Sequence, residues 1–329
     1  MFLLKSISDA IYDNDYPCDV MGIICEYVPH KQRIFCGCDH FIILKNDGTL
    51  YSWGNDGFGQ VSNTPKGSGF ISVSINGNHS VILKDDGTLY SWGYSCIGAF
   101  DIPKGLGFIE VSSGGWHFVV LKDDGSLHSW GSDDYGQVSD TPKESGFMEV
   151  SSGGWHSVAL KYDGTLHSWG DDRNGEVSAT PKGSGFISIS SGGCRSVALK
   201  DDGTLHSWGS DGFGQVSNTP KGSGFIGVYT GRTHSVALKD DGTLCSWGND
   251  EDGEVSNTPK GSGFIQVSTG GFHTVALKDD GTLHSWGRDR FGEVSDTPKG
   301  SGFIEVSAGQ RYSVALKDDG TVHSWGQWY

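Results

Sequence analysis

The sequence contains no long apolar run and has few basic residues. None of its 329 residues lies in a segment that approaches the ~18 apolar residues of a membrane span. The opening MFLLKSISDA lacks the basic start and sustained apolar core of a signal peptide. Lys and Arg number 24 against 40 Asp and Glu, a net charge of −16 that disfavours a broad nucleic-acid or anionic-membrane surface. We therefore expect an intracellular protein, cytoplasmic or nuclear, without direct nucleic-acid or membrane binding.

Cysteine is scarce and irregularly spaced. The seven cysteines are Cys18, Cys25, Cys36, Cys38, Cys96, Cys194 and Cys245. An odd, irregular set is a poor disulfide framework. The four early cysteines lie near His30 and His40 but lack paired C-x₂₋₄-C knuckles, so we interpret them as reduced thiols and not as zinc ligands. We expect neither a metal nor a cofactor.

Motifs of common catalytic sites are also missing. The sequence has no G-x-S-x-G elbow, P-loop or H-E-x-x-H pair. The acidic segments NDEDGE at 249–254 and DDRNGE at 171–176 lack the D-x-D-x-D-G series of a calcium loop, and we interpret them as solvated turns. The sequence therefore predicts a protein that is not an enzyme.

What the sequence does contain is one phrase, LKDDGTLHSWG at 199–209, that returns along almost its entire length. Its tryptophan recurs at intervals of 38 or 39 residues, at Trp53, Trp92, Trp130, Trp169, Trp208, Trp247, Trp286 and Trp325. A fixed period of this length indicates a repeat architecture. Because a large ring can fill the space between neighbouring units, we predict that all eight tryptophans are structural and buried.

Within each unit the phrase predicts a β-hairpin, since HSVALK and TLHSWG are strand-like and DDG supplies a turn. The clearest unit, at 149–187, reads EVSSGGWHSVAL, KYDGTLHSWG and DDRNGEVSATPKGSGFI. We interpret it as four short antiparallel strands, with the fourth in the glycine-centred segment after the tryptophan. Four strands per unit make a blade of an all-β, closed β-propeller.

The number of blades is eight by copy count, with seven as the close alternative. Seven units are complete, and the eighth, at 306–326, lacks its fourth strand and its return segment. We expect the N-terminal segment to complete the eighth blade.

The phrases GGWHSVAL, DGTLHSWG and TPKGSGFI resemble the repeat of the regulator of chromosome condensation (RCC1-like) family, over residues 33–326. The resemblance implies a β-propeller at 32–329 whose loops bind other proteins. It also implies two specific alternatives, a guanine-nucleotide exchange factor for a Ran-like small GTPase and a chromatin binder.

Residues 1–31 stand outside the repeat. Apolar residues with helical spacing predict one amphipathic helix, and they are Val20, Ile23, Ile24, Tyr27 and Val28. Residues 15–29 faintly resemble the opening helix of an F-box, which implies a substrate-recognition subunit of a ubiquitin ligase. The alternative is a helix that caps the propeller. The expected partner is thus a protein, with a small GTPase and a ubiquitin-ligase component as candidates.

The candidate partner site lies fourteen residues before each repeat tryptophan, where otherwise similar units differ. We predict partner contacts there from Asp39, Asn78, Trp116, Trp155, Phe272 and Arg311, while Cys194 and Thr233 complete the ring. A second variable ring, five residues after the tryptophans, is the competing surface: Phe58, Ile97, Tyr135, Asn174, Phe213, Asp252 and Phe291. The alternative to both is unselected drift in exposed loops.

A histidine follows the first ring in six units, at His40, His79, His117, His156, His234 and His273, with Arg195 and Tyr312 in the other two. Because this position is spread around the whole molecule, we expect packing and hydrogen bonding, not a metal site or a catalytic base.

Overall fold

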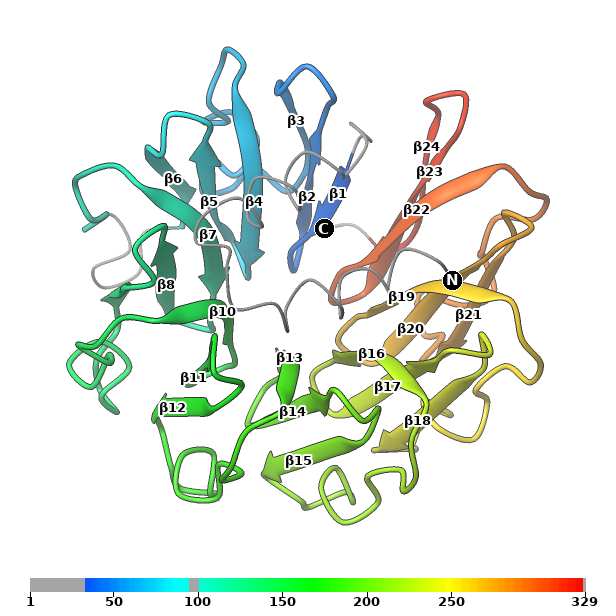
Figure 1. The fold of residues 1–329 in the computed structure, drawn as a ribbon. Coiled ribbons are helices and arrows are strands. Elements are labelled where there is room, and N and C mark those ends of the chain that lie inside the picture. Colours follow the sequence, from blue (N-terminus) through cyan, green and yellow to red (C-terminus); the bar gives the residue numbers. More distant parts are fainter. Residues whose placement is uncertain (1–32, 95–100, 328–329) are drawn as a thin grey trace, which may run out of the picture. The chain divides into compact units, whose positions relative to one another are not determined.

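The computed structural model describes residues 33–94 and 101–327, which form eight antiparallel sheets of three strands each (Figure 1). Each sheet is built from three consecutive strands and is one blade, so blade 1 is β1–β3 and blade 8 is β22–β24. The first strand of each blade lies nearest the centre, and the blades follow one another around it. The all-β propeller fold is confirmed, and the number of blades is eight.

The strand bounds repeat with the sequence period. The first strands are β1 (Arg33–Cys36), β4 (Phe70–Asn76), β7 (Phe108–Ser113), β10 (Phe147–Ser152), β13 (Phe186–Ser191), β16 (Phe225–Thr230), β19 (Phe264–Thr269) and β22 (Phe303–Ala308). The second strands are β2 (His40–Leu44), β5 (His79–Lys84), β8 (His117–Lys122), β11 (His156–Lys161), β14 (Arg195–Lys200), β17 (His234–Lys239), β20 (His273–Lys278) and β23 (Tyr312–Lys317). The third strands are β3 (Leu50–Gly54), β6 (Leu89–Gly93), β9 (Leu127–Gly131), β12 (Leu166–Gly170), β15 (Leu205–Gly209), β18 (Leu244–Gly248), β21 (Leu283–Gly287) and β24 (Val322–Gly326).

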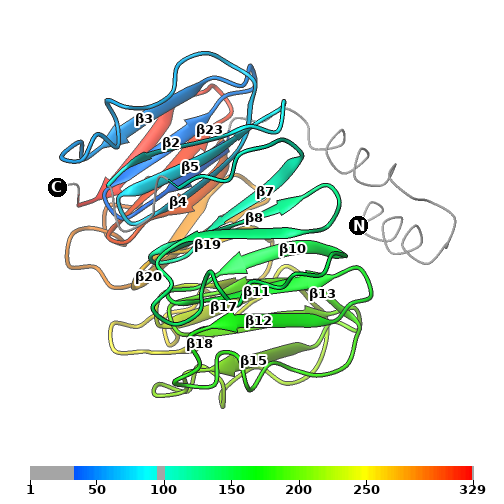
Figure 2. The ribbon, with the colours of Figure 1, turned by 90° about the vertical axis from the view of Figure 1, so that its left-hand side faces the viewer.

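The blades lie side by side (Figure 2). The middle strand of each blade is buried on both faces, which holds each blade between its two neighbours. In β14, Val197 and Leu199 pack toward the following blade, where they meet Phe225. Ala198 points the other way, into a cluster with Trp208 and the preceding blade's Val158. This alternation follows from the two-residue period of a strand, and it spreads the hydrophobic core over all the seams between blades.

The predicted fourth strand is wrong for the described residues, because the segments described after the tryptophans form turns. In blade 4, the Asp172 carboxylate accepts hydrogen bonds from the backbone N–H groups of Val177 and Ser178, at 2.9 and 2.8 Å. The Glu176 carboxylate accepts another from the Asn174 N–H, at 2.8 Å. Since these side chains satisfy the backbone donors locally, the segment does not form a ladder of backbone hydrogen bonds with the third strand.

Blade 8 packs directly against blade 1. Tyr312, Val314 and Leu316 form one buried cluster with the first blade's Ile34 and Ile43. The backbone N–H of Ile34 donates to the Glu305 carboxylate at 2.9 Å, and the Tyr312 hydroxyl donates to the His40 carbonyl at 2.5 Å. In the part of the chain that the structure describes, the eighth blade takes all its strands from residues 303–326.

The expectation that the N-terminal segment completes the eighth blade lies outside the described residues. Within those residues each blade, the eighth included, has three strands. The helix predicted within residues 1–31 and the F-box-like stretch at 15–29 lie outside the described residues.

Seven of the eight repeat tryptophans are buried in the seams between blades: Trp92, Trp130, Trp169, Trp208, Trp247, Trp286 and Trp325. Trp208 is 2% exposed, and its indole N–H donates to the carbonyl of Glu176, 32 residues earlier, at 2.9 Å. The prediction of burial is wrong for Trp53, which is 60% exposed. Position 21, which is 32 residues before Trp53, lies outside the described residues.

This difference gives a matched test of what the tryptophans contribute. Trp208→Ala should lower the free energy of unfolding by about 3–5 kcal/mol, because it leaves a cavity in a packed seam. Trp53→Ala, the same change in the same local sequence, should cost less than about 1 kcal/mol, because the side chain is already solvated. Chemical denaturation of both variants measures the two costs, and equal losses would contradict the assignment.

Candidate partner-binding face

The six predicted partner residues all stand at the turn between the first and second strands of their blades. Each turn is tied to the start of the loop that follows the third strand. The backbone N–H of Ser132 donates to the Trp116 carbonyl at 2.8 Å, and that of Asp171 to the Trp155 carbonyl at 2.9 Å. The same bond is made to the carbonyls of Asp39, Asn78, Phe272 and Arg311.

These bonds place the second variable ring at the same end of the blades as the first. Both rings therefore lie on one face of the propeller. We call this end the loop face, and its described variable residues are Asp39, Phe58, Asn78, Trp116, Tyr135, Trp155, Asn174, Cys194, Phe213, Thr233, Asp252, Phe272, Phe291 and Arg311. Ile97 of the second ring lies outside the described residues.

The strongest aromatic cluster on the loop face joins blades 3 and 4. Trp116 is 42% exposed and stacks on Trp155, with ring centroids 6.1 Å apart and planes at 27°. Tyr135 meets Trp155 edge-on at 5.7 Å. The guanidinium of Arg173 lies 4.3 Å from the centroid of the Tyr135 ring and also forms an ion pair with Asp171, at 2.8 Å. The result is a continuous row of rings that ends in a cation.

A second cluster, on blades 6–8, combines arginine with phenylalanine. Arg232 and Arg288 lie over the Phe272 ring at 5.7 and 4.9 Å from its centroid. Arg311 lies over Phe291 at 5.6 Å. Such contacts hold the flexible arginine side chains near one orientation and so reduce the entropy that binding would cost.

The sequence analysis missed the clustering of arginine, although the signal was present in the sequence. Within the repeats, lysine falls at two constant positions, at or directly after the end of the second strand and in the TPK or IPK segment. In contrast, five of the seven arginines fall in variable loops: Arg173, Arg232, Arg288, Arg290 and Arg311. The guanidinium is a planar set of five donors, and it stacks on rings and binds carboxylates in ways that lysine does not.

The centre of the loop face is hollowed into a cavity of about 670 Å³. The turns of all the blades line it, with Trp116, Trp155 and Arg232 among the lining residues. The turns approach each other closely, since the Gly154 N–H donates to the Gly193 carbonyl at 2.8 Å. A Cβ on Gly154 would lie 2.6 Å from that carbonyl oxygen, so a side chain here would force neighbouring blades apart.

The buried histidines next to these turns hold the loop face in place. His117 and His156 follow Trp116 and Trp155 directly, and each ring nitrogen Nε2 lies 2.7 Å from a serine hydroxyl of the next blade. Burial lowers the pKa of His117 to about 3 and that of His156 to about 4. In blade 5, Arg195 takes this place and donates to the Arg232 carbonyl at 3.0 Å.

The described residues contain no group of three or more His, Cys, Asp and Glu side chains that could hold a metal ion. The described residues also contain no helix that is long and apolar enough to cross a membrane.

The fold and the loop face together define a β-propeller of three-stranded blades that presents variable loops at one end. The repeat model "Regulator of chromosome condensation (RCC1) repeat" matches residues 32–60, 70–96, 108–137, 149–176, 186–215, 264–293 and 303–327. These ranges make up more than half of the chain, which therefore belongs to the RCC1 repeat family. Blade 6 is outside the matched ranges, yet its strands pair in the same register as those of its neighbours.

Solved structures show the same fold. Prp20p from Saccharomyces cerevisiae has a TM-score of 0.60 and 19% identity, covering 90% of this chain and 95% of that one. The CRINKLY WD40 ectodomain of the Arabidopsis thaliana receptor kinase ACR4 has a TM-score of 0.59 and 22% identity, covering 79% and 98%. The computationally designed Ika8 protein has a TM-score of 0.55 and 19% identity, covering 91% and 98%. No curated protein sequence matches the chain significantly.

Proposed function

We propose that this protein binds a protein partner through its loop face and performs no chemistry of its own. The observation that carries the proposal is the stack of the exposed Trp116 on the half-buried Trp155, extended by Tyr135 and Arg173. Tryptophan, tyrosine and arginine are the residue types that dominate binding energy at protein interfaces. Soluble proteins rarely expose such a cluster without a use for it.

The rings on this face are also held in place before a partner arrives. The turns are fixed by backbone hydrogen bonds to the adjacent loops and by the histidine contacts between blades. A surface that is already ordered loses little conformational entropy on association, which favours affinity.

The family supplies the first candidates for the partner. The structure of Prp20p was described together with its binding to Gsp1p and histones. For this chain we therefore place a Ran-like small GTPase first, as the substrate of an exchange factor, and histones second. A ubiquitin-ligase component remains a further candidate through the F-box-like stretch at 15–29.

Capture of partners by the intact, tagged protein, followed by mass spectrometry, tests the proposal. Trp116→Ala combined with Trp155→Ala should weaken capture at least about tenfold, because each ring is of the type found at interface hot spots. The melting temperature should change little. Tyr162→Ala, which changes an exposed aromatic residue in a hairpin turn at the opposite end of blade 4, is the control and should leave capture intact.

Undiminished capture by the double variant would contradict the assignment to Trp116 and Trp155. If capture were lost instead on changing Phe58, Tyr135 and Phe213, the contacts would move to the outer loops of the same face. Accelerated nucleotide release from a captured GTPase would identify exchange activity, whereas capture without it would indicate binding alone.

A further inference from the structure

Arg232 lies at a place in its turn where most units have glycine. Five of the other seven units carry glycine directly before the first variable ring, at Gly77, Gly115, Gly154, Gly193 and Gly271. A Cβ on Gly154 would lie 2.6 Å from the Gly193 carbonyl oxygen, so a side chain is disfavoured where neighbouring turns come this close. The long side chain of Arg232 is therefore a departure from the pattern of the turns, and it lines the cavity at the centre of the loop face.

The turn that carries Arg232 is held by a second departure from the repeat, Arg195 of blade 5, where six other blades have histidine. Arg195 is 1% exposed, and its guanidinium donates to the carbonyls of Gly231 and Arg232, at 3.3 and 3.0 Å. Burial lowers the pKa of Arg195 only to about 10, so the side chain stays charged at neutral pH. Among the described residues no carboxylate forms an ion pair with it. A buried cation without a counter-charge favours an anion nearby.

A third guanidinium, that of Arg288 in blade 7, joins Arg232 around one ring. The guanidinium carbons of Arg288 and Arg232 lie 4.9 and 5.7 Å from the centroid of the Phe272 ring. The backbone N–H of Arg288 donates to the Phe272 carbonyl at 2.9 Å, which fixes the turn that carries the ring. Asp252 forms an ion pair with Arg288, with Oδ2 and Nε 3.8 Å apart, yet this buried Nε–H has no hydrogen-bond partner in the part of the chain that the structure describes.

We call this cluster the arginine site: Arg195, Arg232, Asp252, Phe272 and Arg288. It holds three guanidinium groups and one carboxylate, in a protein with a net charge of −16. Its residues belong to blades 5–7, which lie next to one another (Figure 1). In the sequence, at least one whole blade separates them from 1–32, 95–100 and 328–329, which lie outside the described residues. The described surface therefore carries a local excess of positive charge here, and Arg232 is exposed.

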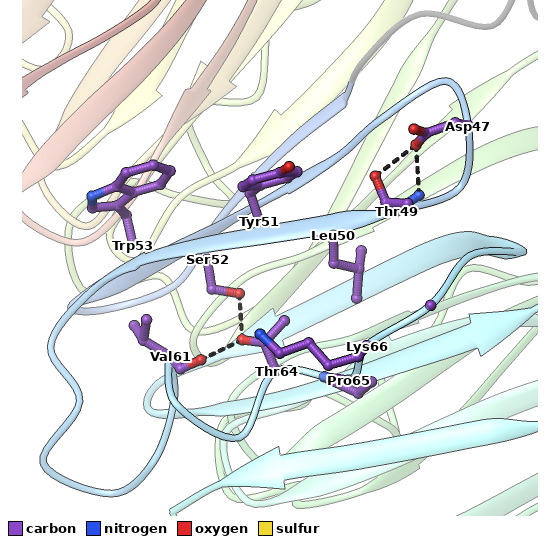
Figure 3. Close-up of a pocket in the computed structure, with 11 residues that line it drawn as sticks. Asp47, Thr49, Leu50, Tyr51, Ser52, Trp53, Val61, Thr64, Pro65 and Lys66 are labelled. Carbon is purple, nitrogen blue, oxygen red and sulfur yellow. Dashed lines mark hydrogen bonds between the residues drawn. The ribbon is translucent and has the colours of Figure 1, made fainter.

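A second cavity, of about 460 Å³ beside β3, lacks this charge pattern (Figure 3). The Thr49 hydroxyl donates to the Asp47 carboxylate at 2.6 Å, and the Thr64 hydroxyl donates to the Ser52 hydroxyl at 2.7 Å. Lys66 and Asp47 are the charged residues among those that line it, one of each sign. Because these charges balance and the polar side chains bond to one another, this cavity is not marked for an ionic ligand.

We propose that the arginine site binds an acidic segment of a partner protein, with a glutamate or aspartate carboxylate held by Arg232 and Arg288 and a neighbouring apolar side chain against Phe272. This inference rests on the proposed function, because it names the chemistry that the loop face selects in its partner. Guanidinium groups form paired, charge-assisted hydrogen bonds with carboxylates. The charge of Arg195 adds to the attraction without contact with the ligand.

A nucleic acid fits the arginine site less well. Its phosphates repeat along the whole strand and require an extended basic surface. Around this site the surface is not basic throughout, since Asp250 and Glu251 are exposed in the adjacent loop of blade 6. A short acidic segment, in contrast, can place one or two carboxylates at the arginines and keep the rest of its chain away from these acidic side chains.

Fluorescence polarisation with the full chain tests the proposal. The probe is a fluorescein-labelled peptide of glutamate, phenylalanine and glycine, and the reference is the same peptide with glutamine in place of each glutamate. We expect saturable binding of the glutamate peptide and at least about tenfold weaker binding of the glutamine peptide. Arg232→Gln should weaken binding of the glutamate peptide about tenfold. Asp252→Asn should strengthen it, because a competing carboxylate is removed.

Arg290→Gln is the matched control. Arg290 is exposed, lies in the same loop as Arg288 and loses the same charge, but it is not part of the arginine site. This variant should keep the affinity for the glutamate peptide within about twofold of the wild type, because solvent and salt screen an exposed charge that does not touch the ligand. Since Arg232 is exposed, Arg232→Gln should fold normally, which its melting curve checks.

Absence of binding to the wild type, equal binding of the two peptides, or equal losses in Arg232→Gln and Arg290→Gln would overturn the proposal. So would tighter binding of a single-stranded oligonucleotide of equal charge that Arg232→Gln abolishes. Failure here is distinguishable from failure of the proposed function. If the glutamate peptide does not bind but partner capture is still lost on changing Trp116 and Trp155, the loop face binds a partner by other chemistry.

Discussion

Acidification to near pH 5 should strongly destabilise this protein, because five buried histidines remain neutral in the folded state. Burial is the main cause that lowers their pKa values to about 3 for His117 and His234, and to about 4 for His40, His156 and His273. In the unfolded chain each titrates near 6.5. As the pH falls from 6.5 toward 4, the unfolded state binds protons that the folded state cannot, so stability is lost.

Two half-buried carboxyl groups, Glu110 and Glu149, act in the opposite direction. Burial raises the pKa of Glu110 to about 8, with the nearby Glu149 as a further cause, and raises that of Glu149 to about 7. In the folded state each carboxyl group stays protonated at pH values above 4.5, where it is ionised in the unfolded chain. Its stabilising contribution to the folded state is therefore present at low pH and is lost as the pH rises. Five histidines against two carboxyls leave a net uptake of about three protons on unfolding near pH 5.5, or about 4 kcal/mol per pH unit.

Urea unfolding at pH 7, 6 and 5 measures this slope. His156→Gln is the informative variant, because glutamine can still bind the Ser196 hydroxyl but does not titrate. This variant should take up about one proton fewer on unfolding than the wild type. The pH slope of its free energy of unfolding should therefore be smaller by about 1.4 kcal/mol per pH unit. A free energy of unfolding that stays constant between pH 7 and 5 would show that the histidines are not held neutral.

The second large effect should come from Tyr312, which joins the two ends of the ring. Tyr312→Ala should lower the free energy of unfolding by about 3–5 kcal/mol, because it empties a fully buried site and removes the hydrogen bond to the His40 carbonyl. Hydrogen exchange should show lost protection in β1 and β2, more than 260 positions away in the sequence. That remote loss is what a closed ring predicts and an open array of repeats does not.

Two other variants separate ring closure from general destabilisation. Tyr312→Phe removes only the hydroxyl and should cost about 0.5–1.5 kcal/mol, with most of the protection in blade 1 retained. Trp208→Ala should destabilise the seam between blades 4 and 5 without a selective loss in β1 and β2. Unchanged protection of β1 and β2 in Tyr312→Ala would argue that the contact between blades 8 and 1 does not hold the ring.

The hairpins could be predicted from the sequence because their signals are local. Strands β14 and β15 pair with Val197 opposite Ser207, as the DDG turn and the alternation of apolar residues require. The fourth strand was predicted wrongly because, after six of the eight tryptophans, an aspartate side chain binds the backbone of its own loop. Hydrogen bonds within a loop leave no periodic pattern, so the sequence could not distinguish this turn from a short strand.

The variable positions of the candidate site were also visible in the sequence, but their arrangement was not. The two rings were expected to be alternatives, yet Tyr135 touches Trp155 although they come from different rings and different blades. Two positions 20 residues apart in the sequence meet only because neighbouring blades stand side by side. Their contact, and that of Arg311 with Phe291, depends on the seam geometry.

The amino-acid sequence by itself determined the repeat, its eightfold count, the hairpin of every unit and the residues that differ among units, because each of these is a local or periodic property. The tertiary structure decided which tryptophans are buried. Trp53 and Trp208 share the sequence SWG, but among the described residues only Trp208 has a segment that links two blades, 176–186, beside it. Burial depends on what lies across the seam, and that neighbour is supplied by distant parts of the chain.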